Sequence, residues 1–350
     1  MIPTHQRPGL LRRLLESLAS CRKPEGFLGV TVVENGERQG VEAIVAQAPR
    51  ELRVCYLHLA QANKSAALNL SLEHADDELL LFLDDDVRVE PDILCAYVRT
   101  ASRITGPAYF GGPLQADLEV LPQPWLRLPG SVRGWSLPAG SLTVDSPRFL
   151  GANWAAYADQ LRAAGGFNPE VGPGGTTGAG GQEREMQHRL HARGVAAIYV
   201  EQALVWHWVP ASRCSVEWSI RRAWERGVAY GLRIREKGLI SWTAQSVRIR
   251  LREYREARTE TFLALGYSMK LEFAWWRGYV TGCLQRFITT TNSPGTGRLQ
   301  FREQRSATDA AIYDYSNRHR DTWAAGPLPP NSRFAGSVPT ASRISGHAGR

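Results

Sequence analysis

The stretch Leu79-Leu80-Leu81-Phe82-Leu83-Asp84-Asp85-Asp86-Val87 places five apolar residues directly before three carboxylates, the acidic triplet. Five apolar residues without polar alternation are typical of a strand buried on both faces of a parallel sheet. Three acidic side chains at its end repel one another and lose hydration, so solvent or a cation must compensate them. A divalent metal is the expected cation, because such ions prefer carboxylate ligands. The position supports this, since open α/β sheets bind ligands at the carboxyl ends of their strands. The alternative is a solvated acidic turn before a helix begun by Pro91.

The composition fits one large globular domain with an appendage. The chain has 350 residues, 43% of them hydrophobic, which is enough to bury a sizeable core. Its five cysteines are widely spaced and form no CxxC pair, which favours reduced thiols in the cytoplasm over disulfides or structural zinc. No stretch resembles a signal peptide or reaches the roughly 18 apolar residues of a membrane span. We therefore expect a soluble or peripheral protein.

The positive charge is concentrated in the C-terminal third. Residues 231–350 contain 19 Lys and Arg against 9 Asp and Glu, whereas residues 1–230 contain 23 against 25. A basic region can meet nucleic acid, anionic lipid headgroups or an acidic acceptor, and composition alone does not choose among them. We retain peripheral contact with the inner face of a membrane ahead of nucleic acid.

Strands and helices alternate through the first two thirds of the chain. The pattern predicts strands over 29–33, 53–59, 79–83, 108–112, 196–200 and 204–208, and helices over 8–23, 40–47, 63–74, 91–104, 183–193 and 214–238. Between them we expect a long loop over 113–147, a helix ending at Arg162 and a glycine-dense loop over 172–181 that orders over a ligand. This alternation predicts right-handed βαβ units in a mostly parallel sheet flanked by helices.

Three regions follow from the same pattern. A domain over 1–231 precedes a basic helical region over 232–325, with helices expected over 242–267 and 270–287. Residues 326–350 are rich in Pro, Gly and Ser without a core pattern, which predicts a disordered tail.

The opening strand is unusually short. Only Met1 and Ile2 precede the Pro3-Thr4 turn, whereas a typical strand has about five or six residues. We hypothesise that the natural protein begins several residues earlier, with a stretch rich in Val and Ile.

Six groups of residues, in chain order, resemble the family 2 glycosyltransferases of GT-A fold. They are Ile2-Pro3-Thr4-His5-Gln6-Arg7-Pro8, Val32-Val33-Glu34-Asn35-Gly36, Asn63-Lys64-Ser65-Ala66-Ala67-Leu68-Asn69, Phe82-Leu83-Asp84-Asp85-Asp86, Gly165-Gly166-Phe167-Asn168 with Gly181-Gln182-Glu183-Arg184-Glu185, and Val205-Trp206-His207. The chain departs from the family pattern at Gln6, Ser65 and Gln182. The resemblance covers about residues 1–231.

The resemblance implies a metal-dependent, inverting enzyme that uses a nucleotide-sugar donor, with a UDP-sugar expected. The acceptor would be a carbohydrate, a lipid-linked molecule or a small molecule. The ion would be Mn²⁺ or Mg²⁺, held by Asp84, Asp86 and His207. The implied catalytic base is Glu183. The implied donor contacts are Pro3, Thr4, Glu34, Asn63, Lys64, Asn69, Asp84 and Asp85.

Several of these residues also have a plain structural interpretation. An acid at Glu183 would favour the first turn of its helix through the macrodipole, and Glu185 is a rival base that points away from it. His207 suits a core as well as a metal. The two asparagines and Lys64 are equally suited to capping and packing their helix, although Lys64 can instead reach a phosphate. The tryptophans suit a core better than a sugar-stacking role.

Two other functions remain open. A non-catalytic GT-A subunit or sugar-nucleotide-binding protein would explain the departures from the family pattern. A nucleotidyltransferase also uses acidic residues at a strand end, but it would carry a glycine-rich basic loop after its first strand, and none is present.

Overall fold

The computed structural model describes residues 1–123, 125–126, 128, 132, 134–141, 143–144, 149–176, 181–232 and 262–291. The predicted tail over 326–350 lies outside these residues. So do most of the predicted basic region and part of the glycine-dense loop.

The first strands form a parallel ladder in the order β1-β2-β3. β1 (Ile2–Thr4) lies beside β2 (Val30–Asn35), and β2 lies beside β3 (Val54–Leu59). Met1 joins this ladder to β4 (Leu79–Phe82), because its amino group donates to the Leu81 carbonyl at 2.9 Å and its carbonyl accepts from Leu83 N at 3.1 Å. The short opening segment thus fills a central position between β2 and β4.

The sheet continues past β4 with mixed strand directions. Its order is β4-β10-β6-β11-β9, with β6 at Ala108–Gly111, β9 at Thr143–Val144, β10 at Trp154–Tyr157 and β11 at Ala196–Tyr199. β10 is antiparallel to both β4 and β6, whereas β6 and β11 are parallel. The edge strand β9 is antiparallel to β11, so β6 and β11 form the parallel pair of this part of the sheet.

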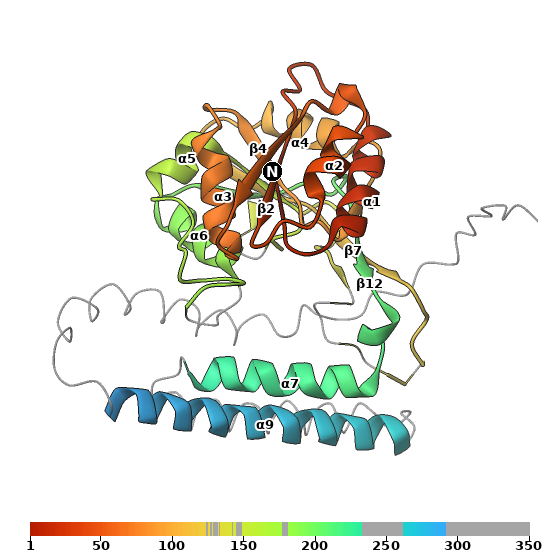
Figure 1. Ribbon diagram of the computed structural model, residues 1–350, viewed down its shortest axis with the longest axis vertical. Helices are drawn as coiled ribbons and strands as arrows, with labels where there is room; N and C mark the ends of the chain where they lie inside the picture. The colour runs from red at the N-terminus through yellow and green to blue at the C-terminus, as the bar shows by residue number, and fades with distance from the viewer. Residues whose placement is uncertain are drawn as a thin grey trace, which may run out of the picture.

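Helices cover both faces of this sheet (Figure 1). Leucine and isoleucine side chains of α1 (Pro8–Ala19), α2 (Val41–Ala46) and α4 (Ile93–Ala101) pack in one core cluster. Side chains of α3 (Lys64–Glu73), α5 (Ala158–Ala163) and α6 (Gln182–Ala192) pack in a second. Leu80 and Phe82 face the second cluster, and Leu81 and Leu83 the first. The β4 strand is covered on both faces, as the apolar run predicted.

A smaller sheet lies beyond the end of β4. It has the order β5-β12-β7-β8, with β5 at Val87–Val89, β12 at Val205–Val209, β7 at Leu114–Leu118 and β8 at Gly134–Trp135. Short 3₁₀ turns occur at Arg50–Leu52 and Ala211–Arg213. Because β5 directly follows the acidic triplet and pairs with β12, this sheet brings His207 next to Asp86.

The α/β architecture predicted from the sequence is confirmed, with local differences. Strand β5 was not predicted, and the helices expected over 242–267 and 270–287 are not separated at 268–269, since α9 runs unbroken through these residues. Residues 154–157, which were predicted to be helical, form strand β10, and only Ala158–Ala163 are helical. Their two alanines favour a helix, but pairing with β4 and β6 overrides that propensity. The predicted loop over 113–147 also contains strands β7, β8 and β9.

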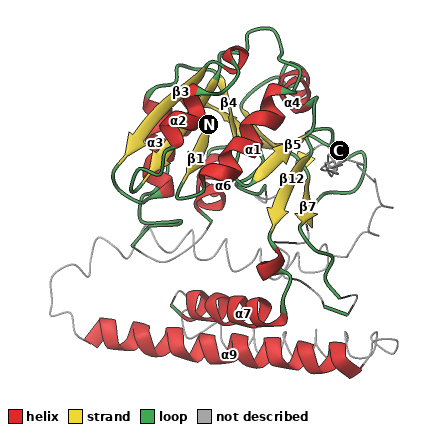
Figure 2. Ribbon diagram, turned by 45° about the vertical axis from the view of Figure 1, so that its right-hand side comes forward, coloured by secondary structure: helices red, strands yellow, loops and turns green. Residues whose placement is uncertain are grey.

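Helices α7 (Val216–Gly231) and α9 (Phe262–Thr291) run side by side below the sheets (Figure 2). A Cβ atom at Gly227 would lie 2.1 Å from the Trp275 carbonyl oxygen, and one at Gly278 would lie 2.1 Å from the Trp224 oxygen. Gly231 and Gly282 make equally close approaches to the opposite backbone. Because later residues of α7 meet later residues of α9, the two helices are parallel. Glycines four residues apart on both helices let the backbones touch.

This close approach predicts opposite effects for two glycines of α9. Gly278→Ala should destabilise the helix pair by about 1–3 kcal/mol, because a methyl group cannot fit against the Trp224 backbone. Gly266→Ala should be neutral or stabilising by up to about 1 kcal/mol, because nothing lies within 4 Å of its Cβ position. Urea unfolding followed by tryptophan fluorescence measures both. Equal effects of the two substitutions would contradict the packing.

Candidate active site

The carboxylates of the acidic triplet form ion pairs with two cationic side chains from other parts of the chain. Arg7 reaches two carboxylates at once, with Nη2 at 2.7 Å from Asp85 Oδ1 and Nη1 at 2.7 Å from Asp86 Oδ2. Lys64, the first residue of α3, forms an ion pair with Asp84 Oδ1. Asp85 and Asp86 are buried, whereas the Asp84 side chain keeps 26% of its surface exposed. The repulsion expected within the triplet is therefore relieved inside the protein itself.

The ends of β1 and β2 position Arg7 and Asp85. Thr4 Oγ1 donates to Asp85 Oδ2 at 2.7 Å, and Asn35 Nδ2 donates to the Thr4 carbonyl at 2.8 Å. Gln6 adopts a left-handed backbone conformation with φ of 55°, which turns the chain sharply before α1. The strand ends thus meet at one edge of the sheet, where open α/β proteins bind ligands.

The two buried carboxylates have opposite pKa shifts. Burial raises the pKa of Asp85 to about 6, although Arg7 and the Thr4 hydroxyl act in the other direction. Burial also opposes ionisation of Asp86, but the hydrogen bond and charge of His207, together with Arg7, outweigh it and hold its pKa below the usual range. Asp86 therefore stays ionised where Asp85 takes up a proton.

A line of polar side chains connects the triplet to Glu183. With its amide oriented to satisfy both neighbours, Gln182 accepts from Lys64 Nζ at 3.2 Å and donates to Glu183 Oε2 at 3.3 Å. Burial opposes the charge of Lys64, yet Asp84 more than compensates and raises the Lys64 pKa. Burial also raises the pKa of Glu183, and Lys64 only partly offsets this. The order of the line is Asp84, Lys64, Gln182, Glu183.

A glycine leaves the space for the Glu183 carboxyl group. A Cβ atom at Gly151 would lie 3.3 Å from both Cδ and Oε2 of Glu183. Glu185 is turned elsewhere, since Arg189 donates to its two carboxylate oxygens at 2.8 and 2.7 Å. Of the two acids considered as a base, only Glu183 is linked to Asp84, through Gln182 and Lys64.

Two of the three predicted metal ligands lie side by side. His207 Nε2 is 3.6 Å from Asp86 Oδ2, and Asp86 Oδ1 is buried without a hydrogen-bond partner among the described residues. Asp84 pairs with Lys64 and does not join them. In the described part of the chain, no three His, Cys, Asp or Glu side chains are arranged to hold an ion. The carboxylate and imidazole donors nevertheless suit Mn²⁺ or Mg²⁺, and Asp86 Oδ1 has a lone pair to offer.

Glu34, a predicted donor contact, is fully engaged within the protein. It is fully buried, and its carboxylate accepts from Gln39 N at 2.6 Å and from the Tyr56 hydroxyl at 2.5 Å. Burial and this bond raise the pKa of Tyr56 to about 12. A contact between Glu34 and a nucleotide base would require these bonds to yield.

The predicted asparagines fasten the loop after α5 to α3. Asn63 caps α3 by accepting from Ala66 N at 2.9 Å, and its Nδ2 donates to the Pro169 carbonyl at 2.8 Å. Asn69 exchanges two hydrogen bonds with the Phe167 backbone, at 2.8 and 2.7 Å. Both asparagines therefore have the structural role that the sequence left open. Pro3 lies within β1, opposite Val33.

Three tryptophans among the described residues contact other side chains of the protein. Trp154 is buried and stacks on Phe82 with ring centroids 4.8 Å apart. The guanidinium groups of Arg88 and Arg13 lie 4.4 and 4.3 Å from the ring centroids of Trp206 and Trp208.

Sequence reasoning missed the roles of Arg7 and Gln182. In the sequence, Arg7 is one residue of the motif Ile2-Pro3-Thr4-His5-Gln6-Arg7-Pro8, and Gln182 is a departure from the family pattern. The available signal for Arg7 was its position: it is a cation just after the first strand, at the sheet edge where the acidic triplet lies. For Gln182 there was no comparable local signal.

Comparison with known proteins supports the sequence-based prediction. Residues 1–139 match the model of the family described as Glycosyl transferase family 2. Residues 1–139 are therefore similar to this family, in agreement with the resemblance of the motifs. The O-antigen biosynthesis protein RfbC of Myxococcus xanthus is 26% identical over 234 residues, which are 61% of this chain and 17% of that protein. The chain thus spans less than a fifth of this curated relative.

Three solved structures are similar at a more distant level. The mannosyltransferase PcManGT from Pyrobaculum calidifontis, in complex with GDP-Man and Mn²⁺, has a TM-score of 0.45 and 17% identity, covering 92% of this chain and 86% of that one. GalNAc-T7 with UDP, GalNAc and Mn²⁺ has a TM-score of 0.49 and 14% identity, covering 66% and 49%. S. aureus TarS 1-349 with UDP-GlcNAc has a TM-score of 0.45 and 11% identity, covering 83% and 90%. At this level of similarity, these structures assign no residue role in this chain.

The ion pairs of Arg7 predict a pH-dependent loss of stability. Because the pKa of Asp85 lies above its ordinary value, its favourable contribution is present at low pH and is lost as the pH rises through about 6. Arg7→Met removes the cation that opposes Asp85, and the Arg7 side chain is 39% exposed, so its penalty should grow by only about 1 kcal/mol from pH 5 to pH 8. The part of the penalty that comes from Asp86, which is ionised at both pH values, should not change.

Urea unfolding in EDTA at the two pH values measures this effect. Arg222→Met is the matched control, because the pair of Arg222 with Glu225 is exposed on both sides. A penalty for Arg7→Met that does not grow with pH would refute the assignment.

Proposed function

We propose that this chain is an inverting glycosyltransferase that moves a sugar from a nucleotide-diphosphate donor to an acceptor hydroxyl with the help of Mn²⁺ or Mg²⁺. The observation that carries the proposal is the line Asp84, Lys64, Gln182 and Glu183. It sets a half-buried carboxyl group beside the strand end where the family 2 domain would bind its donor.

The metal would be held by Asp84, Asp86 and His207. Asp86 Oδ1 and the neighbouring imidazole would supply the first ligands, and Asp84 would join by exchanging Lys64 for the ion. When bound, the ion supplies positive charge that offsets the negative charge developing on the departing diphosphate. The released Lys64 ammonium group would then be placed to meet a phosphate oxygen.

The catalytic base would be Glu183. Inversion requires a carboxylate on the far side of the sugar that takes the proton from the acceptor hydroxyl as the hydroxyl attacks. Burial raises the pKa of Glu183, which makes its carboxylate a stronger base than an exposed one. Gln182 and the space at Gly151 would hold the carboxyl group in position.

The donor would lie over the ends of β1 and β4. Thr4 and Asp85 form a buried hydrogen-bonded pair at this edge, and this pair would open to contact the ribose of a UDP-sugar. Pro3, Glu34, Asn63 and Asn69 would shape the pocket, the last two through the loop that they fasten. The similarity to an O-antigen biosynthesis protein supports a carbohydrate or lipid-linked acceptor in polysaccharide synthesis.

Metal-dependent donor binding is tested first. In a thermal-shift assay, UDP with Mn²⁺ should raise the melting temperature of the wild type, because a ligand that binds only the folded state stabilises it by mass action. Asp86→Asn should abolish the Mn²⁺-dependent part of this shift. Asp92→Asn, at a surface acid paired with Arg22 and Arg99, should leave it unchanged. A full shift in Asp86→Asn would remove Asp86 from the metal site.

The role of Glu183 is tested by transfer kinetics. Glu183→Gln keeps the size and hydrogen bonding of the side chain but cannot accept a proton, so kcat should fall by about 10²-fold or more with donor affinity little changed. Glu185→Gln is the matched control and should retain near-normal turnover. The reverse result would identify Glu185 as the base. Donor binding without transfer in the wild type would favour a sugar-nucleotide-binding protein.

A further inference from the structure

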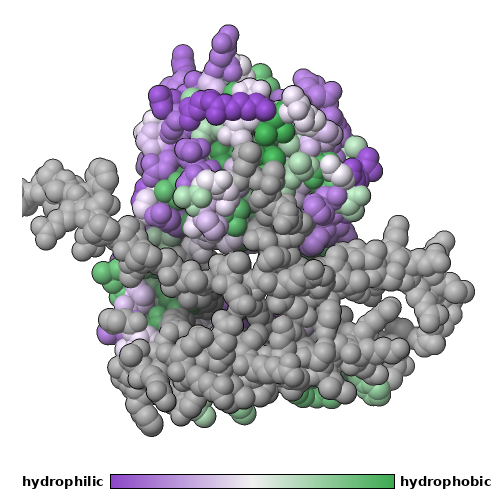
Figure 3. Space-filling view, turned by 180° about the vertical axis from the view of Figure 1, so that it is seen from behind, coloured by the Kyte–Doolittle hydropathy of each residue, from purple (hydrophilic) through white to green (hydrophobic). Residues whose placement is uncertain are grey.

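Helix α9 exposes a row of large apolar side chains, the α9 stripe. The row comprises Met269, Phe273, Val280, Leu284 and Phe287, which are 67%, 71%, 52%, 59% and 69% exposed. Their spacings of four, seven, four and three residues place them on one side of a helix. Figure 3 shows hydrophobic side chains along the edge of the molecule where α9 lies. An exposed apolar row of this size marks an interaction surface.

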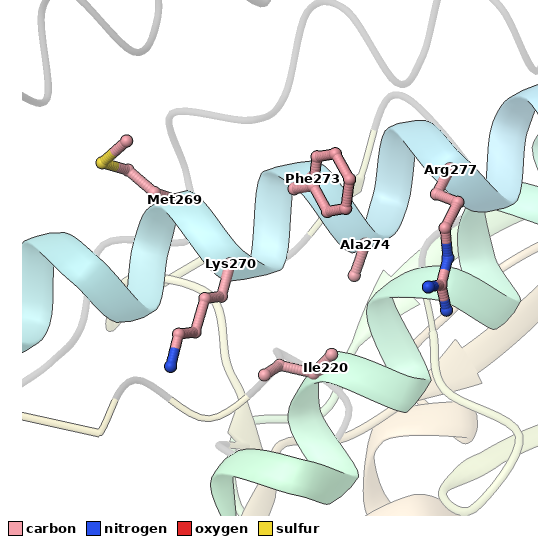
Figure 4. A pocket seen from close by; sticks show the side chains of 6 residues that line it. All are labelled: Ile220, Met269, Lys270, Phe273, Ala274 and Arg277. Atoms are coloured by element: carbon pink, nitrogen blue, oxygen red, sulfur yellow. The ribbon is translucent and has the colours of Figure 1, made fainter.

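Positive charges accompany the stripe. A shallow groove of about 380 Å³ between α7 and α9 is lined by Ile220, Met269, Lys270, Phe273, Ala274 and Arg277. The cationic side chains of Lys270 and Arg277 extend from α9 toward α7 on either side of Ile220 (Figure 4). Arg221 lines the adjoining part of the same groove. Across the two helices, six Lys and Arg stand against three Glu.

This combination matches one class of partner best. A nucleic acid would pair with the cations but leave the phenylalanine and methionine side chains of the stripe exposed to water. A second copy of the chain would bring like charges together, since each copy carries a net charge of +8. An anionic lipid surface uses both features, because cations meet phosphate groups while apolar side chains enter the boundary between headgroups and acyl chains.

The helix pair provides a rigid support for such contact. The glycine contacts hold α7 against α9, and the 30 residues of α9 extend over about 45 Å. In the part of the chain that the structure describes, no helix is long and apolar enough to cross a membrane. The stripe would therefore lie along a lipid surface.

We propose that α9, supported by α7, binds the surface of an anionic bilayer. Phe273, Leu284 and their neighbours on the stripe insert between headgroups, while Lys270, Arg277 and Arg221 contact lipid phosphates. This contact is separate from sugar transfer and holds whether or not the catalytic proposal does.

The test is co-sedimentation of the full chain with vesicles. The wild type should bind vesicles of phosphatidylcholine with about one-third phosphatidylglycerol, bind pure phosphatidylcholine much less, and dissociate as salt is raised. The double substitution Phe273→Ser with Leu284→Ser should weaken binding to the anionic vesicles by about tenfold or more. Leu28→Ser with Leu121→Ser, at exposed leucines outside α7 and α9, is the matched control and should have no effect.

Charge is tested in the same assay. Lys270→Gln with Arg277→Gln should weaken binding by about tenfold or more, whereas Arg12→Gln with Arg50→Gln, at exposed positions elsewhere, should have little effect. Absence of binding to anionic vesicles would overturn the proposal, as would equal losses in the control variants. A dimer in light scattering that Phe273→Ser with Leu284→Ser dissociates, with vesicle binding unchanged, would show instead that a second copy covers the stripe.

Discussion

Three adjacent carboxylates at the end of a buried strand are the constraint on which the arrangement of this domain depends. Their charge must be compensated where little water is available. Arg7 comes from the turn after β1 and Lys64 from the first turn of α3, so both segments must meet the end of β4. The parallel ladder satisfies this requirement, since it brings the ends of β1, β2 and β4 to one edge. The ion pairs of the site therefore depend on the strand order of the sheet.

The parts of the fold that follow a local pattern could be predicted from the sequence. The alternation from Pro8 to Phe82 predicted the helices and strands of that segment, because amphipathic helices and uniformly apolar strands leave clear patterns. Asp84, Asp85 and Asp86 stood out because three adjacent carboxylates directly follow an apolar strand. Glu183 and His207 came only from the resemblance of the motifs, since they are about 100 residues or more from the triplet and nothing in their neighbourhood indicates proximity.

The missed features depend on contacts between distant segments. Strand β10 contains Ala155 and Ala156, and it is a strand because β4 and β6 pair with it on both sides. The engagement of Glu34 depends on Tyr56 from the next strand. Gln182 links Lys64 to Glu183 only after α3 and α6 have packed on the same face of the sheet. Contacts between distant segments leave no periodic pattern in the sequence, so pattern analysis cannot predict them.

The glycine contacts between α7 and α9 raise the question of helix register. A small residue every four positions repeats with each helical turn, so sliding one helix by about 5.4 Å would recreate most of the same backbone contacts. The aromatic residues distinguish the alternatives, because Tyr230 lies 5.5 Å from Trp275 and 6.1 Å from Tyr279 between ring centroids. A slip of one turn would replace one of these rings by Leu271 or Cys283. The glycines therefore set how closely the two helices approach, and the aromatic cluster sets the register of one helix along the other.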